Sequence, residues 1–225
     1  MVRRRELKYI ITEEEFGRLQ SVLDTIMEPD KHMVAGRYMV RSQYYDSIDD
    51  EELYANLDGL SDKHKIRLRI YSLDDAFARL ECKCKSNADG VKFAIPITRE
   101  EAEAIAQRRY GFLLERSEEA AHRLYIKMTS HIYCPKAIVE YERTAYRYPA
   151  GDVRITFDRN IRGGMGLGSI YEECPAYVPL LDADRGVLEI KYSGVYPPAL
   201  MSMVGVLDVS SQAYSKYSMA MTYLA

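Results

Sequence analysis

Charged side chains recur at every second position in several segments that also carry regularly spaced apolar residues. Because successive side chains of a strand point to opposite faces, residues i and i+2 share one face. The charged sets are Lys65, Arg67 and Arg69; Glu81, Lys83 and Lys85; Arg4, Glu6 and Lys8; Glu189 and Lys191; and Arg154, Thr156 and Asp158. Arg and Lys bind phosphate oxygens, while carboxylates suit a hard divalent cation that also bridges to phosphate. These sets therefore indicate phosphate chemistry assisted by a metal ion.

A solvated sheet face is the ordinary explanation for any one of these strands, because antiparallel sheets often expose polar side chains on one side. Repetition argues against that explanation here, since Lys, Glu and Asp are depleted in strands, and the Thr, Ser and Gln that usually fill exposed strand positions are scarce. If the charged face lines the inside of a closed barrel, its cations repel one another, and a polyanion would relieve that repulsion. Under that arrangement, the charged faces of the strands would line a tunnel that binds phosphate.

The elements that must position these residues are strands and helices of clear periodicity. Helices are expected from the capping box at Thr12–Glu15 up to Pro29, after the capping box at Thr98–Glu101, over about 117–130, and as two short helices after Pro197. Strands are expected at 5–11, 34–45, 65–71, 78–85, 91–97, 137–148, 153–157 and 187–192. Short turns between strands predict an α+β fold: an antiparallel, closed β-barrel of about eight strands with helices packed outside.

The composition limits the function classes. The 225 residues carry a net charge of −3 and show no linker, so we expect one domain over 1–225 and no binding of nucleic acid through bulk charge. Neither a signal peptide nor an apolar run of about 18 residues is present, which predicts a cytoplasmic protein without membrane insertion, although a membrane-bound partner stays possible.

Nucleophilic side chains give no competing site. The four cysteines lack zinc spacing and are interpreted as free thiols in a reducing compartment. The four histidines are scattered, and no Ser/His/Asp or Cys/His arrangement is recognisable. The glycine-rich segment 163–168 lacks the Gly-Lys-Ser/Thr ending of a phosphate loop and is interpreted as a flexible surface loop or lid.

Nine short motifs, in order along nearly the whole chain, resemble the VTC domain, a branch of the triphosphate tunnel metalloenzymes of the CYTH-like superfamily. They are Arg4-x-Glu6-x-Lys8-Tyr9, Tyr44-Tyr45-Asp46-Ser47, Lys65 to Arg69, Leu80-Glu81-x-Lys83, Val91-Lys92, Tyr141-x-Arg143-x-Ala145-Tyr146, Arg154 to Asp158, Leu188 to Lys191, and Ser215-Lys216-Tyr217. The resemblance implies an antiparallel β-barrel whose interior binds triphosphate and metal.

Residue roles are also implied by this resemblance. Phosphate-binding and catalytic positions are Lys8, Arg67, Arg69, Lys83, Lys92, Arg143, Arg154, Lys191 and Lys216. Further substrate-binding positions are Arg4, Lys85, Tyr141 and Ser215. Glu189 is the expected ligand for Mn²⁺ or Mg²⁺, with Glu6 and Glu81 as helpers.

The activity implied by the resemblance is phosphoryl transfer: an ATP-dependent polyphosphate polymerase that adds the terminal phosphoryl group of ATP to a phosphate or polyphosphate end. ATP and polyphosphate or triphosphate are then the binding partners. Three alternatives stay open on the sequence. They are a tripolyphosphatase or nucleoside triphosphatase using the same tunnel, a polyphosphate-binding module without turnover, and a plain sheet with a solvated charged face.

Overall fold

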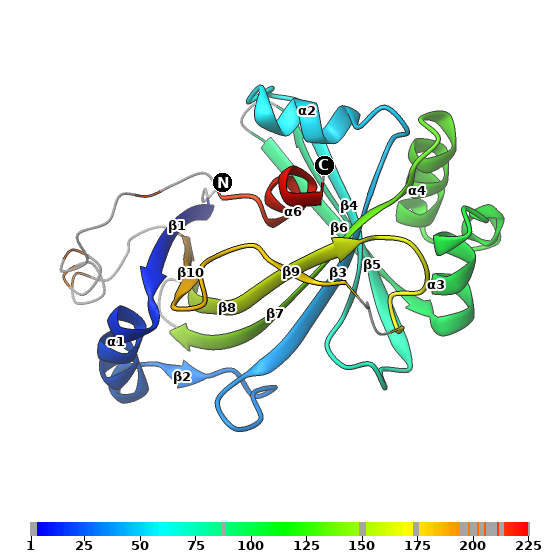
Figure 1. The fold of residues 1–225 in the computed structure, drawn as a ribbon. Coiled ribbons are helices and arrows are strands. Elements are labelled where there is room, and N and C mark those ends of the chain that lie inside the picture. Colours follow the sequence, from blue (N-terminus) through cyan, green and yellow to red (C-terminus); the bar gives the residue numbers. More distant parts are fainter. Residues whose placement is uncertain are drawn as a thin grey trace. The chain divides into compact units, whose positions relative to one another are not determined.

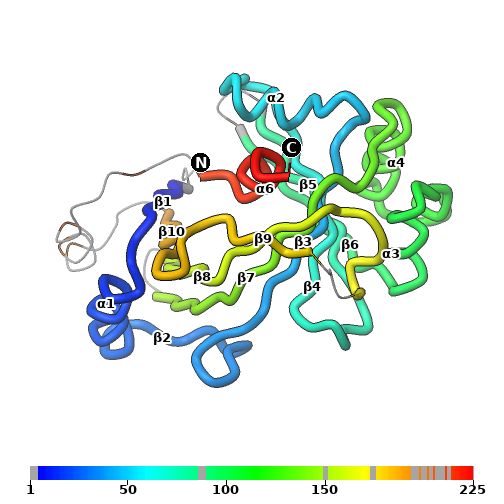
Figure 2. The backbone as a smooth tube through the Cα atoms, in the orientation of Figure 1, coloured from blue at the N-terminus to red at the C-terminus, as the bar shows by residue number. Residues whose placement is uncertain are grey.

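The computed structural model describes residues 4–86, 89–148, 152–172, 176–193 and 214–224, with single positions at 198, 202, 205 and 211. Figures 1 and 2 show the path of the chain through its elements. The strands are β1 (Arg4–Thr12), β2 (Glu28–Pro29), β3 (Tyr38–Asp46), β4 (Lys63–Ile70), β5 (Phe77–Ser86), β6 (Asp89–Thr98), β7 (Cys134–Tyr148), β8 (Val153–Met165), β9 (Val178–Pro179) and β10 (Arg185–Ser193). The helices are α1 (Glu13–Ile26), α2 (Glu51–Leu57), α3 (Arg99–Ala106), the 3₁₀ turn η1 (Gly111–Leu114), α4 (Glu119–Ser130) and α6 (Lys216–Leu224).

The prediction of a closed barrel is wrong. The strands form one antiparallel sheet in the order β1-β10-β8-β7-β3-β4-β5-β6, with β2 paired to β7 and β9 to β8. Among the described residues no pairing joins β1 to β6, so the sheet is open. Side-chain alternation defines the two faces of each strand, but closure also needs a matched tilt and stagger of all strands, which no local pattern specifies. Pro96 in β6 is consistent with an edge strand, because proline has no N–H for a second neighbour.

Most of the predicted elements are confirmed. All eight expected strands are present, seven of them within a few residues of the expected bounds, while β8 continues to Met165 instead of ending at Phe157. The helices after both capping boxes and the helix ending at Ser130 are present too. Residues 87 and 88, between β5 and β6, and most of the segment after Pro197 lie outside the described residues, and α6 corresponds to the last helix expected there. No helix in the described part of the chain is long and apolar enough to cross a membrane.

The glycine-rich segment partly differs from the expected surface loop. Gly163 and Gly164 are buried and belong to β8, so only the positions after Met165 leave the strand. A Cβ on Gly166 would lie 2.6 Å from the backbone nitrogen of Ala137. Glycine is needed there for a close backbone approach, which is a structural task and not phosphate binding.

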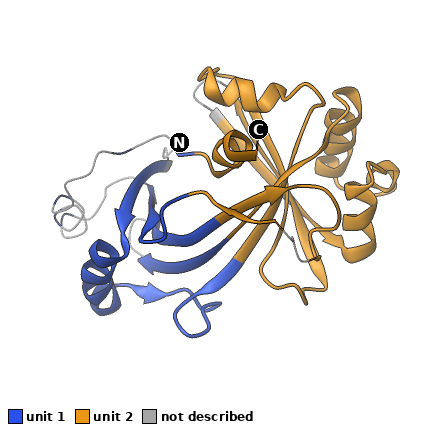
Figure 3. Ribbon diagram, viewed as in Figure 1, with its two compact units in different colours: residues 1–39, 141–161, 181–214 blue, residues 40–140, 162–180, 215–225 orange. Residues whose placement is uncertain are grey.

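The chain divides into two compact units (Figure 3). Unit 1 comprises residues 1–39, 141–161 and 181–214, and unit 2 comprises residues 40–140, 162–180 and 215–225. Strands β3, β7 and β8 contribute residues to both units. The expectation of one domain over 1–225 stays a prediction.

The core of unit 1 lies between helix α1 and the apolar face of β1, β10 and β8. Phe16 of α1 stacks on Phe157 of β8, with ring centroids 4.0 Å apart and planes 10° apart. Helix α1 begins at the predicted capping box, in which the Thr12 side chain accepts from the Glu15 backbone N–H and the Glu15 carboxylate accepts from the Thr12 backbone N–H. The charged residues of these strands are thereby directed to the opposite face.

The core of unit 2 is built in the same way on β4, β5 and β6. Their apolar residues are fully buried with residues of α3, η1 and α4: Ile66, Leu68, Leu80, Ile97, Ile105, Leu113 and Leu124. The capping box at Thr98 and Glu101 begins α3 as predicted. Alternation again leaves the charged residues of the strands on the face away from these helices.

A glycine in β10 tests how tightly the unit 1 core fixes the strand that carries Glu189. A Cβ on Gly186 would lie 2.5 Å from Cζ of Phe157 and 2.6 Å from the carbonyl oxygen of Asp158. We expect Gly186→Ala to lower the free energy of unfolding by about 1–3 kcal/mol, because the backbone and a stacked ring must shift. Gly17→Ala is the control: it meets no atom within 4 Å on α1 and should stabilise by about 0.5–1 kcal/mol. Urea unfolding measures both, and equal stability of the two variants would contradict this packing.

Candidate phosphate and metal site

The pairing of β1 with β10 brings two carboxylates and two lysines together in unit 1. The register places Lys8 opposite Glu189, and Glu6 opposite Lys191. Lys8 Nζ lies 3.1 Å from Glu6 Oε1 and 3.7 Å from Glu189 Oε1, while Lys191 Nζ donates to Glu189 Oε2 at 3.0 Å. Lys8 Nζ also donates to the Tyr214 carbonyl oxygen at 3.0 Å. A small cluster of alternating charges results.

Glu189 is the buried centre of this cluster, with 9% of its surface exposed. Burial alone would raise the pKa of its carboxyl, but Lys191, a hydrogen bond with Glu6, Lys8 and Arg143 together hold that pKa well below its ordinary value. The side chain is therefore a carboxylate at neutral pH. Burial lowers the pKa of Lys191, and Glu189 and Glu6 counteract part of that shift.

Strand β8 adds a polar atom beside Glu189. Thr156 is paired with Glu189 in the β10–β8 register and is 3% exposed. Its Oγ1 is buried and has no hydrogen-bond partner. Unpartnered buried hydroxyls are uncommon, because leaving one unsatisfied costs about 1–3 kcal/mol. A ligand bound next to Glu189 would supply the missing partner.

The guanidinium groups of unit 1 are held by carboxylates. Arg143 on β7 donates to both oxygens of the fully buried Asp158, at 2.6 and 2.8 Å, and lies over the ring of Tyr141 at 5.2 Å. Arg154 on β8 is more exposed and donates to Asp30 Oδ2 at 3.0 Å and to the Tyr38 hydroxyl at 3.2 Å. Bidentate pairing fixes Arg143 more firmly than the single carboxylate contact of Arg154.

In unit 2 a second buried carboxylate gathers the cations of β4 and β6. Glu81, 4% exposed, accepts from Arg67 Nε at 2.9 Å and from Lys92 Nζ at 2.9 Å, and lies 3.5 Å from Arg69 NH1. Burial raises the pKa of Glu81, but Arg67, Arg69 and Lys92 outweigh burial and lower it to about 2. Both Glu81 oxygens are engaged by cations, so in this structure the carboxylate orients them. Its predicted role as a metal ligand stays a prediction.

Strand β3 supplies hydroxyl groups to the same cations. Arg67 NH1 donates to the Tyr44 hydroxyl at 3.3 Å, and Arg69 Nε donates to Ser42 Oγ at 3.2 Å. The ring of Tyr44 stacks on Tyr217 of α6 with centroids 5.3 Å apart. Tyr217 in turn donates to Asp46 at 2.7 Å. The arginines are therefore held in defined orientations from two sides.

The other predicted site residues of unit 2 lie at the start of α6 and on β5, outside the group of cations that contact Glu81. Lys65 Nζ donates to Ser215 Oγ at 3.0 Å, next to Lys216, the first residue of α6. Lys83 and Lys85 are exposed on β5, opposite Lys65 and Lys63 of β4. Arg4 belongs to β1, and its side chain lies outside the described residues.

The structure thus groups the predicted residues by unit. Unit 1 holds Glu6, Lys8, Tyr141, Arg143, Arg154, Glu189 and Lys191, and unit 2 holds Arg67, Arg69, Glu81, Lys83, Lys85, Lys92, Ser215 and Lys216. The sequence analysis named Tyr44, Asp158 and Thr156 within its motifs and charged sets but assigned none of them a role in the site. Their contacts come from neighbouring strands, so the only sequence signal was their place in the Tyr-Tyr-Asp-Ser motif and in the alternation that begins at Arg154.

The donor set of unit 1 fits a hard divalent cation. No cluster of three or more His, Cys, Asp or Glu in the part of the chain that is described could hold a metal ion. Mg²⁺, however, is often held by one or two carboxylates together with substrate phosphates and water. Glu6 and Glu189, which lie within hydrogen-bond reach of each other, supply that number of carboxylates.

The strands form an antiparallel sheet, and in each unit its charged face carries cations around a buried carboxylate, Glu189 in unit 1 and Glu81 in unit 2. The chain belongs to the VTC domain family, which it matches over residues 3–225. No curated protein sequence matches the chain.

Two solved structures illustrate the shared fold. A candidate adenylyl cyclase from Hippeastrum, described as having a dominant triphosphatase activity, has a TM-score of 0.59 and 12% identity, over 100% of this chain and 97% of that chain. A candidate adenylate cyclase from Bacillus halodurans has a TM-score of 0.54 and 15% identity, over 93% of this chain and 92% of that chain. At such identities the likeness shows the fold alone.

Tyr44 provides a test of the electrostatics in unit 2. Burial raises the pKa of its hydroxyl, but Arg67, Arg69 and Lys65 outweigh burial and lower it from 10.0 to about 8. Because the folded-state pKa is lowered, the phenolate stabilises the fold fully above about pH 10, and this contribution is lost as the pH falls through about 8.

The ultraviolet absorbance of tyrosinate should therefore show a step near pH 8 in the folded protein. Tyr44→Phe should remove the step, whereas Tyr54→Phe, at an exposed position of α2, should keep it. A step that survives in Tyr44→Phe would refute the assignment.

Proposed function

We propose that this chain is a phosphoryl-transfer enzyme that uses the charged faces of its strands to bind ATP and a growing polyphosphate chain. The terminal phosphoryl group of ATP passes to the end of a phosphate or polyphosphate acceptor, and ADP leaves. The observation that carries the proposal is the cluster around Glu189. It combines a buried carboxylate, a second carboxylate in hydrogen-bond reach, three cations and an unpartnered Thr156 hydroxyl. Membership of the VTC domain family supports the polymerase reaction.

The cations on β4, β5 and β6 suit the phosphate chain. Residues of these strands on the charged face include Lys65, Arg67, Arg69, Lys83 and Lys92, with Glu81 as the one carboxylate placed among them by the register. Arg67 and Arg69 are pre-oriented by Glu81, Tyr44 and Ser42, so little side-chain entropy is lost when phosphate binds. The entering polyanion would compete with Glu81 for these cations.

Phosphoryl transfer requires no protein nucleophile in this arrangement. An oxygen of the acceptor phosphate attacks the γ-phosphorus in line with the bond to ADP, which breaks as the new P–O bond forms. The protein holds both reactants in this orientation, and its cations stabilise the charge on the transferred group. Lys8, Lys191 and Arg143 would act at this step, because they surround Glu189.

A divalent cation, Mn²⁺ or Mg²⁺, would be held by Glu189 and Glu6. When bound, it would neutralise part of the negative charge of the phosphate groups. The two carboxylates also keep Lys8 and Lys191 in place, so they serve the charge distribution of the site whether or not the ion is present.

Hydrolysis of a triphosphate is the second candidate. It is favoured by the triphosphatase activity described for the Hippeastrum protein of the same fold. The reaction differs only in the attacking group, which is water instead of a phosphate oxygen.

The experiment that separates these reactions is an incubation of the purified protein with ATP and Mn²⁺ or Mg²⁺. Polyphosphate is resolved on a gel, and ADP and free phosphate are measured in solution. Long polyphosphate with matching ADP is the expected result. Free phosphate without polymer would establish the hydrolase, and tight binding of polyphosphate without turnover would reduce the chain to a binding module.

Glu189→Gln tests the central carboxylate. The amide keeps the shape of the side chain but removes the charge that binds metal and pairs with Lys191. We expect metal-dependent turnover to fall by at least about 100-fold, with the circular dichroism spectrum unchanged. Glu14→Gln on the exposed side of α1 is the matched control and should keep full activity. Full activity of Glu189→Gln would show that Glu189 is not the metal ligand.

A further inference from the structure

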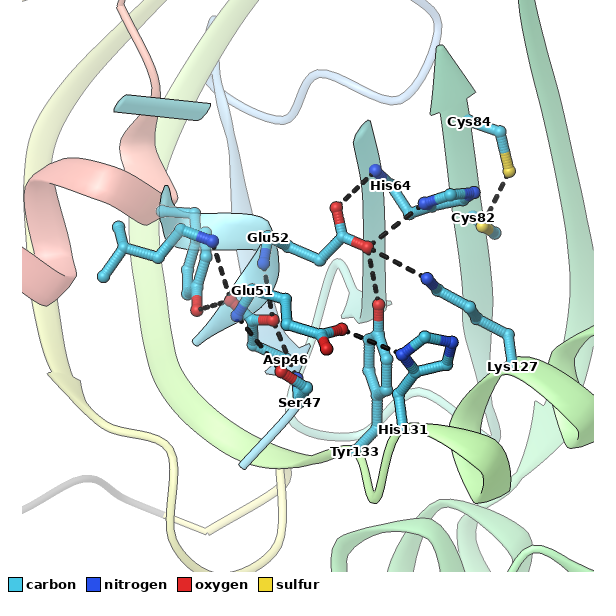
Figure 4. A network of polar contacts seen from close by, with 12 residues as sticks. Asp46, Ser47, Glu51, Glu52, His64, Cys82, Cys84, Lys127, His131 and Tyr133 are labelled. Atoms are coloured by element: carbon cyan, nitrogen blue, oxygen red, sulfur yellow. Dashed lines mark hydrogen bonds and ion pairs between the residues drawn. The ribbon is translucent and has the colours of Figure 1, made fainter. Parts of the chain in front are cut away.

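Two thiols of β5 lie in contact on the face opposite the phosphate-binding residues. Cys82 and Cys84 share one face of the strand, and their sulfur atoms are 3.3 Å apart (Figure 4). Both are free cysteines, as is Cys134, while Cys174 lies outside the described residues. The sequence analysis interpreted all four cysteines as free thiols and gave no reason for these two sulfur atoms to meet.

The surroundings of the pair are polar on one side. On β4, His64 is the cross-strand partner of Cys84, and its Nδ1 lies 3.1 Å from Glu52 Oε1 (Figure 4). Glu52 also accepts from the Tyr133 hydroxyl at 2.8 Å and lies 3.3 Å from Lys127 Nζ. The pair therefore lies between the apolar core of unit 2 and a network of charged side chains, a setting in which only one of the thiols is accessible.

We propose that Cys82 and Cys84 are a redox-active dithiol that a hydroperoxide oxidises to a disulfide within β5. The second step requires the two sulfur atoms to meet, and at the observed 3.3 Å they are already in contact, although the separation must still shorten to the roughly 2.05 Å of an S–S bond. The site is a modification site for a two-electron oxidant, separate from the phosphate chemistry.

The difference in exposure indicates which of the two thiols reacts first with the hydroperoxide. Cys84 is half-buried, so its thiolate can attack the hydroperoxide oxygen, forming a sulfenic acid and releasing an alcohol or water. Cys82 is 2% exposed, and burial, its contact with Cys84 and the charge of Glu52 hold the pKa of its thiol well above the ordinary value. The Cys82 sulfur then attacks the sulfenic sulfur: the S–S bond forms, the S–O bond breaks and water leaves. Overall, the two thiols lose two electrons and two protons.

The strand itself makes this oxidation reversible. Residues two apart in a strand are separated by about 6.6 Å, which is at the upper end of the Cα–Cα distances, about 4.4–6.8 Å, that a disulfide spans. Closing the bond therefore requires β5 to contract locally. A disulfide formed under such strain is readily reduced by a thiol.

Contraction of β5 would also move the residues on its phosphate-binding face. Lys83 stands between the two cysteines and points to the opposite face, next to Glu81, which orients Arg67 and Lys92. Oxidation would therefore weaken phosphate binding in unit 2, a consequence that rests on the proposed function. Reduction would restore it, so the dithiol would act as a redox switch.

The first test is chemical and independent of activity. The reduced full chain is treated with hydrogen peroxide under native conditions, alkylated, and cleaved after glutamate, which releases residues 82–100 with these two cysteines alone. We expect this peptide to lose two hydrogen atoms and to escape alkylation until dithiothreitol is added. Cys134→Ser should behave as the wild type, Cys84→Ser should form no bond, and Cys82→Ser should accumulate a sulfenic acid on Cys84 that dimedone traps. Full alkylation of both thiols after peroxide would overturn the proposal.

The second test measures tripolyphosphate affinity in reduced, oxidised and re-reduced protein. A several-fold loss on oxidation and recovery on reduction are expected for the wild type and for Cys134→Ser, but not for Cys84→Ser. A disulfide that leaves the affinity unchanged would overturn the switch. Failure of the reduced protein to bind tripolyphosphate would instead count against the proposed function, because the disulfide is established by the peptide alone.

Discussion

The charged faces of this protein depend on carboxylates that are buried among cations. Glu81 in unit 2 and Glu189 in unit 1 each occupy a position where the strand register surrounds one acidic side chain with lysines and arginines. Without these anions, rows of like charges in a partly desolvated setting would repel one another strongly. Desolvation of a carboxylate is costly, and the low pKa of both groups shows that attraction to the cations outweighs that cost.

The pairing of the strands places each of these carboxylates directly opposite a cation. Lys8 lies opposite Glu189 and Arg67 lies opposite Glu81 because the apolar faces of the same strands are fixed against α1 in unit 1 and against α3 and α4 in unit 2. A slip of one residue would turn every charged side chain into the core, so core packing and site assembly enforce the same register. The packing of the apolar face of each strand thus fixes the positions of the charged side chains on its other face.

The sequence predicted the strands and their faces because the period-two alternation is local and strong. Closure of the barrel was predicted wrongly, since it depends on pairing between strands far apart in the sequence. Helix α2 was missed because it is seven residues long and buries only Glu52 and Ala55, which gives no apolar stripe. The unpartnered hydroxyl of Thr156 and the position of Tyr44 between arginines depend on neighbouring strands, so no pattern within one strand indicates them.

Under the proposed function, the two charged clusters differ in the ligand they suit. Around Glu81 the cations are in the majority, and the single carboxylate already accepts from them through both oxygens, so an arriving phosphate exchanges one anionic partner for another. Around Glu189 a second carboxylate is within reach, which lowers the local positive charge and makes room for a divalent cation. Binding of the phosphate chain and binding of the metal by paired carboxylates are then tasks of different strands, β4 to β6 for the first and β1 with β10 for the second. Either task can be removed by a single substitution without touching the residues of the other, because no strand is common to the two sets.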